Sequence, residues 1–247
     1  FEIDVTKKLR FDAPNIIAVR AHTAEPLNSR WYTGGGLFRD VTLVATSPVT
    51  WFERHPLYIT TTDNRIVEIQ AEIATRARIN EVPMRTVVRD ADGTVVYTST
   101  KNVPINRKWR TMELKTDSFV VENPRLWSPD DPYLYEGTIQ LWSEGENGPV
   151  CDEIETYFGI REIGTGKFGA NNRNYITLNG KPYFINGVLD QSFNPQGFFT
   201  LPTDEDCRDE ILRLKRIGIN MARVHIKAEE LEATLRRFIQ EVDKNGK

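Results

Sequence analysis

Two side chains that could do chemistry, Arg223 and His225, are two residues apart in the short apolar run 219–226. A run of this length is typical of a buried strand, and alternate residues of a strand point to the same side. The pair could therefore bind a polar ligand through charge and hydrogen bonds. A histidine at a strand end can also be a residue that only hydrogen-bonds within the protein, and the residues alone leave both interpretations open.

A second stretch, Gly164-Thr-Gly166-Lys-Phe-Gly169, has the G-x-G-x-x-G spacing of dinucleotide sites. Such a site needs a helix N-terminus directly afterwards to receive the pyrophosphate. Here the polar residues 171–174 and a predicted strand follow. We therefore expect a flexible linker at this point and no nucleotide cofactor.

The elements before this stretch are predicted to be strands, because apolar and polar residues mostly alternate. A boundary is indicated at Thr46-Ser47-Pro48, with strands predicted before it at 1–5, 16–19 and 41–45. Seven more are predicted after it, at 49–52, 66–74, 85–89, 94–98, 109–114, 134–142 and 153–160. About seven short antiparallel strands in about 115 residues are typical of an immunoglobulin-like sandwich.

The last part of the chain changes from strand to helix periodicity. A hairpin is predicted at 175–185, with the Asn179-Gly180 pair as its turn. Thr203 and Asp206 form a near capping box before an apolar helical stripe that ends at Gly218. The run 219–226 and a second helix up to about residue 246 follow, and this order of strand, helix, strand and helix indicates a parallel βα architecture.

Composition excludes several classes of function. The 32 Lys and Arg against 35 Asp and Glu give a net charge of −3, so there is no basic excess for nucleic-acid binding. No apolar run approaches the roughly 18 residues of a membrane span, so no membrane partner is expected. The two cysteines, Cys151 and Cys207, are too few and too far apart for a disulfide framework or a Cys-rich zinc site. No cofactor or metal is predicted, and the cytoplasm, the periplasm and secretion all stay open.

Several motifs, taken in chain order, point to one family. They are Phe1-Glu-Ile-Asp-Val-Thr, Asn15-Ile-Ile-Ala-Val-Arg20, Trp31-Tyr-Thr-Gly-Gly-Gly-Leu-Phe-Arg39-Asp40-Val-Thr-Leu43, Asn123-Pro-Arg-Leu-Trp127-Ser-Pro129-Asp-Asp-Pro132-Tyr-Leu-Tyr135, Tyr157-Phe-Gly159-Ile-Arg161-Glu162, Leu178-Asn179-Gly180-Lys181-Pro182, Gly187-Val188-Leu189-Asp190-Gln191 and Gly218-Ile-Asn220-Met-Ala-Arg223-Val-His225-Ile-Lys227. Together they resemble glycoside hydrolase family 2, which includes β-galactosidases, β-glucuronidases and β-mannosidases.

The resemblance implies a multidomain, mainly β protein. Residues 1–46 would be the C-terminal part of a jelly-roll sugar-binding domain, and residues 47–162 an immunoglobulin-like β-sandwich. Residues 163–247 would hold a linker, a hairpin and the N-terminal part of a (β/α)8 TIM barrel. A complete barrel takes about 250 residues, so the barrel here would be truncated. Its exposed strand edges would favour self-association, so a homo-oligomer is possible.

The resemblance also implies the chemistry. Retaining glycosidases use two carboxylates about 5 to 5.5 Å apart. The family's catalytic glutamates are on later barrel strands, outside this chain, so we expect no catalytic residue here and no activity of the chain alone. The parent polypeptide would hydrolyse O-glycosidic bonds of β-linked sugars. The alternative is a non-catalytic carbohydrate-binding or structural β-sandwich module.

The residues that the resemblance assigns to the sugar are Asp190, Arg223 and His225. Asp190 would end the first barrel strand and hydrogen-bond sugar hydroxyls, or else cap nearby backbone amides. Arg223 would orient or electrostatically support the nucleophile, and His225 would contact a sugar hydroxyl. Gln191 and Lys227 are weaker candidates.

Overall fold

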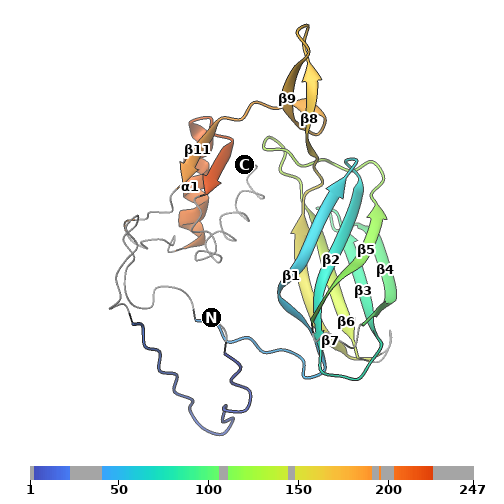
Figure 1. Cartoon of the computed structure of the whole chain (residues 1–247), viewed down its shortest axis with the longest axis vertical. Helices are drawn as coiled ribbons and strands as arrows, with labels where there is room; N and C mark the ends of the chain where they lie inside the picture. Colours follow the sequence, from blue (N-terminus) through green and yellow to red (C-terminus); the bar gives the residue numbers. More distant parts are fainter. Residues whose placement is uncertain are drawn as a thin grey trace. The chain divides into compact units, whose positions relative to one another are not determined.

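The computed structural model describes residues 3–22, 41–105, 111–143, 148–190, 195 and 203–224. The chain divides into two compact units, Phe1–Thr42 and Leu43–Lys247. All helices and strands of the described residues lie in the second unit (Figure 1). None of the described helices is long and apolar enough to cross a membrane.

Seven strands form a β-sandwich of two antiparallel sheets, which face each other in Figure 1. One sheet has the order β1-β2-β5, with β1 at Thr50–Thr62, β2 at Ile66–Thr75 and β5 at Thr111–Val120. The other has the order β4-β3-β6-β7, with β3 at Glu81–Arg89, β4 at Val95–Pro104, β6 at Tyr135–Trp142 and β7 at Val150–Phe158. The seven strands predicted for this part of the chain are confirmed.

The core of the sandwich follows from the alternation of side chains along the strands. On β2, Val67, Ile69, Ala71 and Ile73 are buried, and the residues that alternate with them are only half-buried. On β6, Ile139 and Leu141 are fully buried and join the same apolar cluster. The inner faces of the two sheets therefore form one continuous core.

Both open edges of the sandwich are bridged by an aspartate. At one edge, Asp152 of β7 accepts a hydrogen bond from the Phe52 N–H of β1 at 2.8 Å. At the other edge, Asp117 of β5 accepts from the Tyr97 hydroxyl at 2.7 Å and from the Lys101 ammonium at 2.8 Å, both on β4. The two sheets are thus joined by polar contacts as well as by the core.

Three strands after the sandwich form a small antiparallel sheet in the order β10-β9-β8. The strands are β8 at Ile163–Phe168, β9 at Arg173–Leu178 and β10 at Lys181–Pro182. The predicted Asn179-Gly180 turn is confirmed, with φ of 52° and 76°. The glycine-rich stretch that was expected to be a flexible linker is instead β8, because it pairs with β9 along its whole length.

A βαβ unit ends the described part of the chain. Strand β11 at Gly187–Asp190 and strand β12 at Met221–Val224 pair in parallel, and helix α1 at Asp204–Arg216 connects them. The capping box is present, since Thr203 Oγ1 accepts from the Asp206 N–H at 3.1 Å and the Thr203 N–H donates to the Asp206 carboxylate at 3.1 Å. The predicted second helix lies outside the described residues.

The strands predicted before residue 46 are not formed in the described ranges 3–22 and 41–46. Their apolar side chains are exposed, and Phe11 and Ile16 reach 95% and 93%. A strand needs a neighbour to pair its backbone groups, and within these described ranges none is present. Alternation alone therefore did not produce strands here, and the motif that begins at Trp31 lies outside the described residues up to residue 40.

Candidate functional site

The ends of β11 and β12 hold two of the three predicted site residues. In the parallel register Leu189 pairs with Arg223, and Asp190 pairs with Val224. Asp190 and Arg223 therefore lie at the C-terminal ends of neighbouring strands. His225 and the weaker candidates Gln191 and Lys227 lie outside the described residues.

The register places the Asp190 and Arg223 side chains on opposite faces of the strand pair, because partners in register share a face and neighbours along a strand alternate. Arg223 shares its face with Leu189, and both side chains are exposed. Asp190 shares its face with Val188 and Ala222, and all three are half-buried. The structure thus brings the two residues to the same strand ends and does not bring their side chains together.

Glu210 of α1 identifies the face that carries Asp190. It is half-buried beside the fully buried Cys207 and Ile211. Burial raises the pKa of Glu210, the charge of Asp190 raises it further, and Arg213 opposes the shift. Asp190 therefore faces the helix, and Arg223 lies on the face away from it. The sequence analysis missed Glu210, although its position next to the apolar helical stripe was a usable signal.

Two asparagines fix the other ends of the strands. The Asn186 N–H donates to Asn220 Oδ1 at 2.8 Å, and the Asn220 N–H donates to the Asn186 carbonyl at 3.0 Å. Asn186 Nδ2 also donates to the Gly218 carbonyl at 2.9 Å, and Asn220 Nδ2 to the Phe184 carbonyl at 2.8 Å. These contacts hold the register that places Arg223, and the sequence analysis missed both residues.

Trp127, an aromatic residue that could have stacked on a sugar ring, is a packing residue. It is only 5% exposed, and the Arg161 guanidinium lies over its ring at 4.5 Å. A Cβ atom at Gly159 would come within 2.7 Å of the Trp127 Cβ. No face of this indole is therefore open to a saccharide.

No group of three His, Cys, Asp or Glu among the described residues could hold a metal ion. Cys151 and Cys207 form no disulfide within the described ranges, and Cys207 is a buried residue of α1. In the described part of the chain, the polar side chains at the ends of β11 and β12 are thus the candidates for contact with a ligand.

Comparison with known proteins gives a consistent result. The family model of the glycosyl hydrolases family 2 matches residues 54–161. A β-galactosidase from Bacteroides ovatus is 32% identical over 196 residues, which cover 76% of this chain and 21% of that protein. A β-glucuronidase from Formosa agariphila is 30% identical over 219 residues, which cover 76% of this chain and 20% of that protein. The chain thus spans about a fifth of the length of these relatives.

A solved structure agrees with this result. The crystal structure of a glycosyl hydrolase family 2 member from Bacteroides cellulosilyticus superposes with a TM-score of 0.76 at 28% identity. The match covers 100% of this chain and 32% of that protein. Sequence and fold thus agree: residues 54–161 match the family 2 model, and the chain is similar to part of longer glycoside hydrolase family 2 proteins.

Proposed function

We propose that the chain is the part of a retaining glycoside hydrolase that ends one domain, forms a second and begins a third. Residues 1–46 would belong to a jelly-roll sugar-binding domain, 47–162 to an immunoglobulin-like sandwich and 163–247 to the start of a (β/α)8 barrel. The parent enzyme would hydrolyse O-glycosidic bonds of β-linked sugars, with its catalytic glutamates outside this chain. The names of the relatives, β-galactosidase and β-glucuronidase, support β-galactosides and β-glucuronides as the two substrate classes to test.

The observation that carries the proposal is the position of Arg223. It is exposed near the C-terminal end of a parallel strand, on the face away from α1. In (β/α)8 barrels the helices cover the outside, and the active site is built at the C-terminal ends of the strands. Arg223 would therefore face the substrate side, and His225, two residues later on the chain, would share that side.

Asp190 takes a different place in this proposal. Its side chain shares a face with Val188 and lies near Glu210, on the helix side of the strand pair. This side is away from the face that carries Arg223, which argues against direct contact of Asp190 with a sugar hydroxyl. Arg223 and His225 are thus the residues that we assign to the substrate.

The test compares the 247-residue chain with the longer polypeptide that contains it, using nitrophenyl β-galactoside and β-glucuronide. We expect turnover only from the longer polypeptide. There, Arg223→Ala should lower kcat/KM by about 100-fold, the usual effect of removing one preorganised charged donor. Arg213→Ala, an exposed arginine on α1, is the matched control and should leave the rate unchanged.

Turnover by the 247-residue chain that is abolished by changing one of its own carboxylates would overturn the proposal. Titration calorimetry with galactose and glucuronate measures saccharide binding and so tests the alternative, a non-catalytic carbohydrate-binding module. Saccharide binding by the chain, with no hydrolysis by the longer polypeptide, would identify a carbohydrate-binding module instead.

A further inference from the structure

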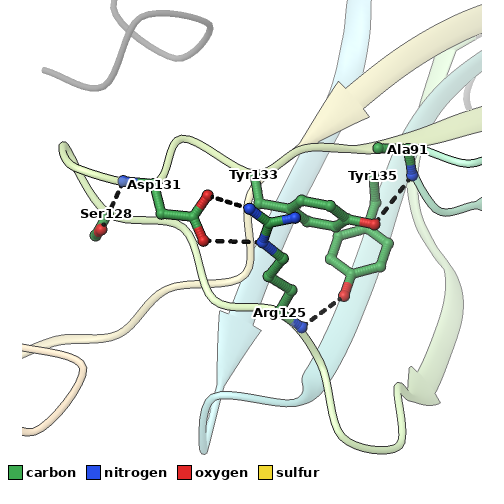
Figure 2. A network of polar contacts seen from close by, with 6 residues as sticks. All are labelled: Ala91, Arg125, Ser128, Asp131, Tyr133 and Tyr135. Carbon is green, nitrogen blue, oxygen red and sulfur yellow. Dashed lines mark hydrogen bonds and ion pairs between the residues drawn. The ribbon is translucent and has the colours of Figure 1, made fainter.

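The loop between β5 and β6, residues 121–134, is held by its own polar network, shown in Figure 2. Arg125 binds Asp131 through two parallel hydrogen bonds of 2.8 and 2.7 Å, and its guanidinium lies 4.6 Å from the centre of the Tyr133 ring. The hydroxyls of Tyr133 and Tyr135 accept the backbone N–H groups of Ala91 and Arg125, at 3.1 and 3.0 Å. A planar, two-pronged contact of this kind fixes geometry as well as adding energy. The loop thus has a defined shape within the sandwich itself.

Trp127 ties the centre of this loop to the point where the chain leaves the sandwich. The backbone N–H of Trp127 donates to the Ile160 carbonyl at 2.8 Å, and the indole ring is buried against Gly159 and Arg161. Arg161 is itself fixed, because its carbonyl accepts from the Thr61 hydroxyl at 2.6 Å. The loop backbone at Trp127 therefore has little freedom to move relative to the sheets.

Two carbonyl groups of this fixed loop accept donors from the later elements. The Trp127 carbonyl accepts Asn179 Nδ2 at 3.0 Å, and Asn179 lies in the turn between β9 and β10. The Pro129 carbonyl accepts the Lys215 ammonium at 3.1 Å, and Lys215 lies in the last turn of α1. Burial raises the pKa of the Tyr183 phenol, and the charge of Asp130, the residue after Pro129, raises it further.

Asn179 makes both of its side-chain contacts with the sandwich and its exit. Its Oδ1 accepts the Glu162 N–H at 3.0 Å, and its own N–H donates to the Glu162 carbonyl at 2.8 Å. Its positive φ is one that asparagine tolerates better than most residues. One side chain thus forms the turn and also binds it to the loop.

We propose that loop 121–134 is an orienting clamp, in which the carbonyl groups of Trp127 and Pro129 hold the β9–β10 turn and α1 at fixed positions on the sandwich. Asn179 and Lys215 are the positioning residues of the clamp. This inference goes beyond the proposed function, because it concerns how one domain fixes the next and holds whether or not the parent polypeptide hydrolyses sugars.

The clamp predicts that its two contacts depend on each other. When two contacts join the same pair of bodies, closing one raises the effective concentration of the partners in the other. Loss of the hydrogen bond from Asn179 to Trp127 should therefore loosen α1, although Asn179 is not part of that helix. Loss of the Lys215 contact should in turn loosen the β9–β10 turn.

Hydrogen–deuterium exchange of the 247-residue chain, followed by mass spectrometry, tests this dependence. Asn179→Asp keeps an acceptor for the Glu162 N–H and a residue suited to positive φ, and removes only the donor to Trp127. Lys215→Met keeps the length of the side chain and removes its ammonium. A net hydrogen bond of ordinary strength predicts an increase of about fivefold in the exchange rate at the distant site, α1 for N179D and β9–β10 for K215M.

Asn174→Asp and Lys167→Met, two exposed positions on the same small sheet, are the matched controls and should change neither site. The proposal is overturned if each variant changes exchange only around the substituted residue, or if the controls have the same distant effect. If N179D unfolds the hairpin, K215M alone decides the question, since it alters only an exposed side chain.

Discussion

Asp117 of β5, which accepts hydrogen bonds from two side chains of β4, offers the sharpest test of how the sandwich is stabilised. The side chain of Asp117 is 2% exposed and that of Lys101 is 40% exposed, so the ammonium can reach water when its partner is lost. The cost of Asp117→Asn should therefore stay below the roughly 3–5 kcal/mol of a fully buried broken pair. What is lost is the charge that strengthens the hydrogen bonds from Tyr97 and Lys101, which contributes about 1.5–3 kcal/mol.

A second contribution comes from the other carboxylate oxygen. Asp117 Oδ2 is buried and has no hydrogen-bond partner among the residues that the structure describes, so an amide NH2 placed there would be a buried donor without an acceptor. This adds about 1 kcal/mol or more. We expect D117N to lower the free energy of unfolding by about 2–4 kcal/mol, and Tm by at least about 8 °C.

Urea unfolding followed by tryptophan fluorescence measures this change. Asp63→Asn is the matched control, because Asp63 is exposed in a turn with positive φ that asparagine also tolerates. It should stay within about 0.5 kcal/mol of the wild type. A D117N variant that unfolds at the same urea concentration as D63N would refute the idea that the Asp117–Lys101 pair stabilises the contact between the two sheets.

Three further outcomes follow from the contacts described above. Burial raises the pKa of Tyr97, and the hydrogen bond to Asp117 raises it further. The contribution of Tyr97 to folding stability is therefore fully present below pH 10 and is lost as the pH rises through the raised pKa. Tyr97→Phe should remove this alkaline loss of stability in urea titrations at about pH 9 to 11. Gly159→Ala should destabilise the sandwich by about 1–3 kcal/mol, because its Cβ would overlap the Trp127 side chain, and an unchanged urea midpoint would contradict this. Burial raises the pKa of Glu210, so its contribution to folding stability is present below about pH 4.5 and is lost as the pH rises. Glu210→Gln should therefore slow amide exchange of α1 at about pH 7 but not at about pH 4. Glu205→Gln, at an exposed position of the same helix, should leave the exchange unchanged at both pH values.

The sandwich could be predicted from the sequence wherever one strand face is buried. On β2 the alternation of buried and half-buried residues from Ile66 to Ile73 is visible in the sequence itself. The second half of β1 was not predicted, because the register shifts between Phe52 and Leu57 and breaks the alternation. An irregularity of this kind is set by the partner strand and leaves no period to detect.

Strand β8 was missed for a different reason. Glycine is depleted in strands, so two glycines in six residues indicate a linker. In the structure, a Cβ at Gly164 would lie 3.2 Å from the Thr177 hydroxyl, and one at Gly166 would lie 2.6 Å from the Phe168 ring. These glycines are needed because side chains lie across the strand there, and only the paired structure contains that information.

The candidate site could be predicted only in part. The capping box, the apolar stripe of α1 and the strand that holds Arg223 all depend on neighbours in the sequence, and each is present. The opposite orientation of Asp190 and its proximity to Glu210 depend on how α1 packs against the strand pair. The contacts between Asn186 and Asn220 join residues 34 positions apart, and no local pattern indicates them.

These two asparagines also limit how the chain can vary in length. If β12 slipped by one residue against β11, every side chain of that strand would change face, and Arg223 would turn toward α1. The same slip would break the hydrogen bonds that join Asn186 to Asn220 and Gly218. An insertion or deletion between Gly218 and Met221 should therefore be far more damaging than the two residues between them suggest, because it would reverse which side of the sheet carries the guanidinium.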